Sequence, residues 1–124
     1  VQDELKELIQ NAEVKNGVSI LGAVVHVDNM DELREAADFV KAKLPVSAVI
    51  LGTAAGDKVN LVGMASPDAV KAGIHMGKVI SQAAKICGGG GGGKPANAQA
   101  GGKDVSKLAD AVAQGVKIIS GMLD

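Results

Sequence analysis

The sequence has almost no aromatic residues. Phe39 is the only one among 124 residues, and Trp and Tyr are absent. Proteins that bind single-stranded nucleic acid commonly stack its bases on aromatic rings. The composition therefore disfavours that mode of recognition.

Cysteine and long apolar segments are scarce too. Cys87 stands alone, so it cannot form an internal disulfide, and we expect a small buried apolar group in a reducing compartment. No apolar run approaches the ~18 residues that a membrane-spanning helix needs. The sequence predicts a cytoplasmic protein with no membrane partner.

Acidic residues are missing from one long stretch. Five lysines and no carboxylate lie between Lys71 and Lys103, although the formal net charge of the whole chain is -1. Residues 1–65 carry net -4 and residues 66–124 carry net +3. A local basic patch of this kind can attract a polyanion even when the total charge is near zero.

The first half of the chain mixes helical and strand-like patterns. Apolar residues in segment 1–16 recur at helical spacing, and Asn16-Gly17 is predicted to end this helix. An apolar strand is expected at 18–27, a capped helix at 29–44, and two strands around a turn at 55–57.

The second half is predicted to be mostly helical. A Ser-Pro pair at 66–67 favours a helix start, and one long helix is expected over 68–87. Its polar stripe contains Lys71, Lys78 and Lys85. A glycine loop with room for a short strand is expected next, and a last helix fills the C-terminal segment.

These elements indicate an α/β or α+β fold, in which helices pack on a small mixed β-sheet. Residues 1–16 are interpreted as the end of a helical arm. Residues 17–124 are interpreted as one globular domain, which is a usual size for a single core.

Six consecutive glycines, Gly88–Gly93, follow the long predicted helix. Their spacing to Lys94 fits G-x-x-x-x-G-K, but a nucleotide-binding loop needs a preceding strand and a Ser or Thr where Pro95 stands. A flexible linker is the simple alternative. We favour an ordered loop whose consecutive amides form an anion-binding nest, with lysines lining an approach for phosphates.

No catalytic or metal-binding set competes with this loop. His26 and His75 lack metal-ligand spacing, and Ser66, Ser81 and Ser106 are better explained as caps or helix surface than as nucleophiles. The sequence therefore predicts no catalytic residue, no metal ligand and no cofactor.

The stretch VKAGIHMGKVISQAAKICGGGGGGKPANAQAGGKD, at 70–104, resembles the C-terminal domain of alanyl-tRNA synthetase, called C-Ala, whose core is a DHH-associated domain. The family pattern is a lysine-containing helix, a glycine run ending in Arg or Lys and Pro, then Ala-Gln-x-Gly-Gly and an Asp-capped helix. Its specific part spans Ala69 to Leu123. One departure is that the run is glycine throughout, where relatives often carry a charged residue.

The resemblance implies a non-catalytic domain that binds tRNA, in particular tRNA-Ala, at the outer corner of the L-shaped molecule and links aminoacylation with editing. Its partners would be the aminoacylation and editing domains of the synthetase, and the helical arm could support a homodimer. A folded RNA surface suits lysines and backbone amides. The predicted RNA-binding residues are Lys71, Lys78, Lys85, Gly88, Gly89, Gly90, Gly91, Gly92, Gly93, Lys94, Pro95, Gln99, Gly101, Gly102 and Lys103.

Two other functions stay open. The related substrate-binding domain of a DHH-type phosphoesterase typically carries a histidine near the glycine run, where this sequence has Lys94-Pro95. A mainly structural role, as a dimerisation or bridging module that uses the first helix, is the second alternative.

Overall fold

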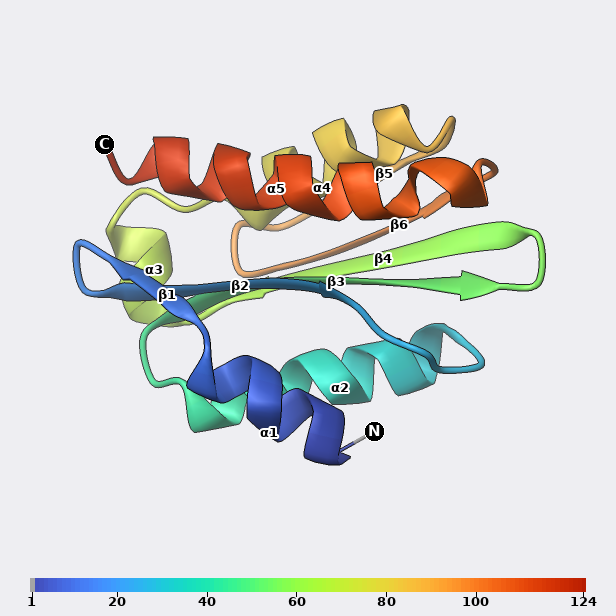
Figure 1. Ribbon diagram of the computed structural model, residues 1–124. Coiled ribbons are helices and arrows are strands. Elements are labelled where there is room, and N and C mark those ends of the chain that lie inside the picture. The colour runs from blue at the N-terminus through green and yellow to red at the C-terminus, as the bar shows by residue number, and fades with distance from the viewer. Residues whose placement is uncertain (1) are drawn as a thin grey trace.

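The computed structural model describes residues 2–124 and contains one six-stranded sheet between two layers of helices (Figure 1). The strand order is β1-β2-β3-β4-β6-β5, with β2 and β3 parallel and the other neighbours antiparallel. The predicted mixed sheet packed by helices is therefore confirmed. The elements, in chain order, are α1 (Gln2–Gln10), β1 (Glu13–Lys15), β2 (Val18–Val24), α2 (Met30–Lys43), β3 (Ser47–Ala55), β4 (Lys58–Ala65), α3 (Pro67–Lys71), α4 (Met76–Ile86), β5 (Gly90–Gly93), β6 (Asn97–Gly102), a 3₁₀ turn (Val105–Lys107) and α5 (Leu108–Met122).

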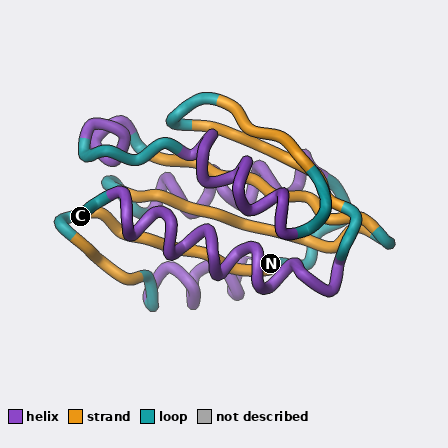
Figure 2. Tube along the Cα trace, turned by 90° about the horizontal axis from the view of Figure 1, so that it is seen from above, coloured by secondary structure: helices purple, strands orange, loops and turns teal. Residues whose placement is uncertain are grey.

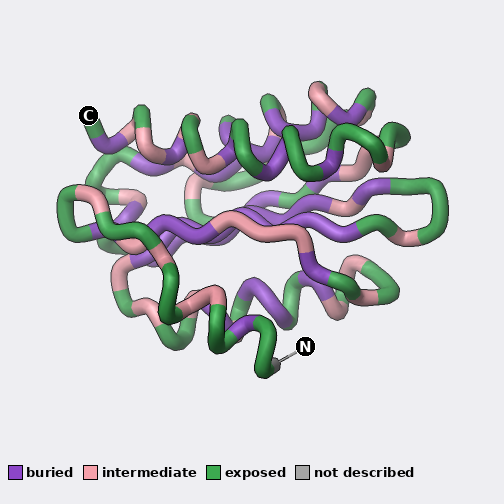
Figure 3. The backbone as a smooth tube through the Cα atoms, in the orientation of Figure 1, coloured by how far each residue is buried: buried purple, intermediate pink, exposed green. Residues whose placement is uncertain are grey.

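The sheet separates two apolar cores. Ile50 of β3 packs on the side of α4 and α5, whereas its neighbours Val49 and Leu51 pack on the side of α1 and α2. This alternation follows from the period of two in a strand, and it explains why β3 is apolar on both faces. Figure 3 shows the central strands as buried and the outer helix surfaces as exposed.

Small residues let the helices lie close to the sheet. A Cβ added to Gly63 of β4 would lie 2.7 Å from both Ile80 and Met76 of α4, and one added to Gly52 would lie 2.7 Å from Leu108 of α5. Figure 2 views the molecule from above, from the side of α4 and α5, and shows these helices running along the strands. No described helix is both long and apolar enough to cross a bilayer.

The prediction of one helix up to Asn16 is wrong in its extent. The helix ends at Gln10, and Glu13–Lys15 forms an edge strand that pairs with β2 across Asn16 and Gly17. Both turn residues have positive φ, 52° and 81°, as a type I′ hairpin turn requires. Asn-Gly is a strong hairpin signal. Because the apolar residues before it have helical spacing, the pair was interpreted as the end of a helix.

The apolar side of α1 is used within the chain. Leu5 is buried, and Leu8 and Ile9 pack against the core on the α2 side of the sheet. Residues 13–15 belong to the sheet, and α1 packs on the core of the same unit. A domain boundary after residue 16 and a homodimer through the arm stay predictions.

The prediction of one continuous helix over 68–87 is also wrong. The helix breaks between Lys71 and Met76, where Gly73 has φ 118° and Ile74 turns into the core with 2% of its surface exposed. Burying Ile74 offsets the lost helical hydrogen bonds. The break removes Lys71 from the polar stripe of α4.

The prediction of a glycine loop is correct in that the segment is ordered, but most of it is a strand. Gly90–Gly93 forms β5, an edge strand paired with β6. An extended strand points successive amides to opposite sides. The glycines therefore do not form the concave nest that the sequence predicted.

Candidate nucleic-acid interface

Helix α4 is fixed at both ends. His75 is its N-cap, and the ring nitrogen Nδ1 accepts a hydrogen bond from the backbone N–H of Lys78 at 3.2 Å. At the other end Gly88 (φ 70°) and Gly89 donate to the carbonyls of Lys85 and Ala84, which is a Schellman motif. A Gly88 in the left-handed region explains why the glycine run begins there.

The N-terminus of α4 is not an anion site. The N–H groups of Met76 and Gly77 donate to the carbonyls of Pro95 and Lys94, at 2.9 and 3.2 Å. Those of Lys78 and Val79 donate to His75. Since the first four amides of the helix are occupied, an anion must be bound by side chains or by another part of the backbone.

Two residues of the glycine strand, Gly91 and Gly93, lie too close to β6 to carry a side chain. A Cβ on Gly77 would clash with the carbonyl of Gly93, and one on Gly91 would clash with Ala100. Gly91, Gly92 and Gly93 also have φ of 158°, 154° and 156°, which residues with a side chain rarely adopt. Contact with α4 and β6 thus explains these glycines.

One edge of β5 has no neighbouring strand. Lys94 and Asn97 exchange backbone hydrogen bonds at 2.9 and 3.3 Å, so the alternation of an antiparallel ladder places Gly92 opposite Gln99 in the next bonded pair. The N–H groups of Gly91 and Gly93 then point away from β6. The carbonyl groups of these two glycines point the same way, so the edge offers donors and acceptors without side chains, and a ribose-phosphate chain can approach it closely.

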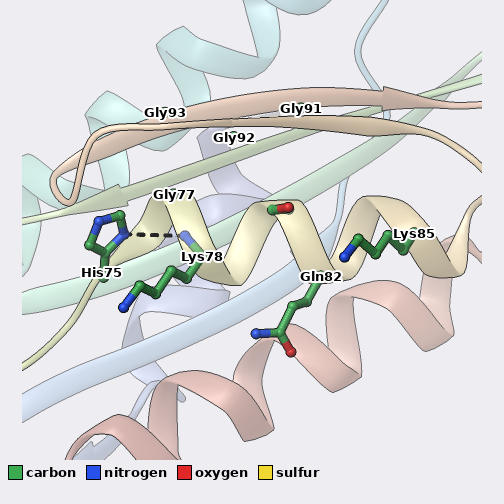
Figure 4. A pocket seen from close by; sticks show the side chains of 9 residues that line it. His75, Gly77, Lys78, Gln82, Lys85, Gly91, Gly92 and Gly93 are labelled. Atoms are coloured by element: carbon green, nitrogen blue, oxygen red, sulfur yellow. Dashed lines mark hydrogen bonds between the residues drawn. The ribbon is translucent and has the colours of Figure 1, made fainter.

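A groove of about 460 Å³ lies between this edge and α4 (Figure 4). Figure 4 shows the side chains of His75, Lys78, Gln82 and Lys85 following one another along α4 beside the glycine strand. No carboxylate lines the groove, so the two ammonium groups are not neutralised there. The lining residues are His75, Gly77, Lys78, Ser81, Gln82, Lys85, Gly91, Gly92 and Gly93.

The structure brings only part of the predicted RNA-binding set together. Lys78, Lys85 and Gly91–Gly93 meet at the groove, whereas Lys71 lies on the separate helix α3. Lys94 and Pro95 form the turn between β5 and β6. Gln99 is exposed on β6, and its Cβ direction alternates with that of the buried Ala98 and Ala100.

A second hollow, of about 340 Å³, lies at the other end of the β5–β6 hairpin. Lys103 lines it together with Lys58, and the remaining predicted glycines, Gly89, Gly90, Gly101 and Gly102, surround it. In the sequence Asp57 directly precedes Lys58, and Asp104 directly follows Lys103. Neither carboxylate lines the second hollow, so two lysines face it as two lysines face the groove.

Sequence reasoning missed four groove residues as site members: His75, Gly77, Ser81 and Gln82. The polar stripe predicted from the sequence included His75 and Gln82. The predicted RNA-binding set, however, took only the lysines from this helix. Ser81 lies at the margin of the stripe. The groove itself depends on β5; a short strand was expected with the glycine loop, but no pattern placed a strand in the glycines themselves.

The remaining reactive side chains lie away from ligand chemistry. Cys87 is fully buried, and burial raises the pKa of its thiol, with a further contribution from Asp104. A raised pKa keeps the thiol protonated and unreactive, as expected for a small buried apolar group. Within residues 2–124 no three His, Cys, Asp or Glu side chains are grouped so as to hold a metal ion.

A family model described as the DHHA1 domain matches residues 17–120. The chain therefore belongs to the DHHA1 domain family. The crystal structure of the C-Ala domain from Aquifex aeolicus alanyl-tRNA synthetase is similar with a TM-score of 0.75 and 30% identity, covering 89% of this chain and 98% of that chain. The resemblance to C-Ala that the sequence predicted is confirmed.

Longer proteins contain a similar segment. An alanine–tRNA ligase of Acetivibrio thermocellus is 46% identical over 123 residues, which is 99% of this chain and 14% of that relative. This chain thus spans about one-seventh of that relative's length. RecJ in complex with Mg²⁺ from Thermus thermophilus is similar with a TM-score of 0.62, covering 97% of this chain and 17% of that chain. Its 12% identity shows a shared fold alone.

Proposed function

We propose that this chain is a non-catalytic tRNA-binding domain that engages the outer corner of tRNA, with tRNA-Ala as its partner. Within a longer synthetase it would help the aminoacylation and editing domains act on the same tRNA. Such a protein works in the cytoplasm, where translation takes place. The resemblance to C-Ala and the chemistry of the groove support this proposal independently.

The single observation that carries the proposal is the groove between α4 and β5. Lys78 and Lys85 are exposed two turns apart on one face of α4, with no carboxylate in the lining. The side-chain-free edge at Gly91–Gly93 lies beside them and lets a ribose-phosphate chain come within hydrogen-bonding distance of the backbone. Lysine is a point charge that suits phosphate contacts and carries no sequence information.

The composition fits a folded RNA better than a single strand. The only aromatic ring, Phe39, lies on α2, half-buried and with Lys43 over its face at 5.6 Å. It is on the opposite side of the sheet from the groove, so it offers no stacking platform there. The domain would then recognise the shape and backbone of the tRNA corner.

Hydroxyl-radical footprinting of a full-length tRNA-Ala transcript with the 124-residue chain tests this function. We expect protection of the outer corner, where the two arms of the L meet, and an affinity that falls steeply as salt rises from 50 to 200 mM. A truncated transcript that keeps only the acceptor stem is the matched control and should bind weakly. Equal binding of both RNAs would contradict engagement of the outer corner.

A further inference from the structure

The N-cap of α4 fixes the orientation and tautomer of a histidine in the groove. The Nδ1 atom of His75 accepts the Lys78 N–H, so Nδ1 carries no proton and the neutral ring carries it on Nε2. The backbone N–H of His75 donates to the sulfur of Met122 on α5 at 3.4 Å. The backbone of His75 is thus held from α5, and its ring is held from α4.

The proton on Nε2 has no partner within the described part of the chain. Hydrogen bonds of this residue involve only its Nδ1 atom and its backbone groups. The side chain is half-buried and lines the groove together with Lys78 and Gly93 (Figure 4). A half-buried N–H donor of fixed direction, beside a cationic groove, is suited to one acceptor oxygen of a bound ligand.

We propose that His75 is an RNA-contacting residue, with the Nε2–H group donating a hydrogen bond to a phosphate oxygen while Nδ1 caps α4. This inference rests on the proposed function, because it assigns a residue to the same groove. Lys78 and Lys85 attract the phosphates by charge, which acts over a distance and in any direction. The imidazole adds a short, directional contact at the end of the groove nearest the β5–β6 turn.

Two substitutions separate the contact from the cap. His75→Ser keeps an oxygen that can cap α4, because serine is a preferred N-cap residue, but it cannot reach the phosphate. His75→Gln places an amide N–H near the position of Nε2 but is a poor N-cap. We expect His75→Ser to keep the melting temperature and to lose about ten- to a hundredfold in tRNA affinity, the range for one hydrogen bond to a charged acceptor. We expect His75→Gln to lower the melting temperature and to retain more of the affinity.

The salt dependence of binding distinguishes this contact from a charged one. A hydrogen bond from a neutral imidazole releases no counterion, so His75→Ser should leave the slope of log K against log[salt] unchanged, measured at pH 8 by fluorescence anisotropy. Lys78→Gln should reduce the slope by about one. The His75 inference is overturned if His75→Ser binds like the wild type, or if affinity follows the melting temperature through both His75 variants. If the wild-type chain itself does not bind tRNA, the proposed function is wrong. If the wild type binds and the His75 variants show one of the results above, only the His75 inference is wrong.

Discussion

Replacing Gly91 by alanine is expected to disrupt the β5–β6 hairpin and to lower the tRNA affinity by more than tenfold. A Cβ at this position would clash with the Cβ of Ala100 and lie 2.6 Å from the carbonyl oxygen of Gln99. The backbone there has φ 158°, which alanine adopts only at a cost. We expect a loss of about 2–3 kcal/mol in the free energy of unfolding, measured by urea denaturation.

Gly90→Ala is the matched control. A Cβ on Gly90 meets no atom within 4 Å, and its φ lies outside the positive range. This variant should keep the wild-type stability within about 0.5 kcal/mol and bind tRNA nearly as well. If both glycines tolerate alanine equally, the close packing of β5 on β6 is wrong.

The double variant Lys78→Glu/Lys85→Glu is expected to bind tRNA about 100-fold more weakly at low salt. Both side chains are exposed and lie on the face of α4 that borders the groove, and their reversal turns two attractive charges into two repulsive ones. The salt slope should fall by about two. Folding should be little affected, because neither lysine forms an ion pair within residues 2–124.

Lys6→Glu/Arg34→Glu changes the charge by the same amount on the other helical layer. Lys6 is exposed on α1 and Arg34 is exposed on α2, both on the opposite side of the sheet from the groove. Anisotropy titrations at matched ionic strength should show only a small loss for this variant. An equal loss in both double variants would mean that the total charge, and not the groove, determines binding.

Local signals in the sequence were sufficient for several elements. Asn29 caps α2 by accepting from the N–H of Glu32 at 2.9 Å, and the Glu32 side chain accepts from Asp28 N–H at 3.2 Å. Ser66 caps α3. Gly56, with φ 65°, and Asp57 form the two-residue turn between β3 and β4. These features depend on neighbouring residues, so a sequence pattern contains them.

The elements that sequence reasoning missed are decided by contacts between distant residues. Nothing in six glycines favours a strand, because glycine is intrinsically poor in strands and has no side chain whose alternation could be seen. The strand forms because β6 pairs with it and α4 leaves room for it. The break before α4 likewise depends on where Ile74 finds the core.

The candidate site shows the same division. The lysine stripe of Lys78 and Lys85 follows from helical spacing and was predicted. The predicted position of Lys71 was wrong, because the helix breaks after this residue. The position of the proton on the His75 ring follows only from the hydrogen bond by which the ring caps α4. Charge could be predicted from composition, but the shape and direction of donors required the tertiary structure.

The central claim is that the open edge of β5 and the polar face of α4 form one surface that accepts RNA. Amide chemical-shift mapping of the ¹⁵N-labelled chain with unlabelled tRNA tests it most directly, since Gly91 and Gly93 report on the edge and Lys78 and Lys85 on the helix. The account predicts that the amide resonances of these four residues shift or broaden together at low salt, while the amide resonances of α1 and α2 are unchanged. Shifts concentrated on α1 and α2, with the glycine edge unchanged, would contradict it.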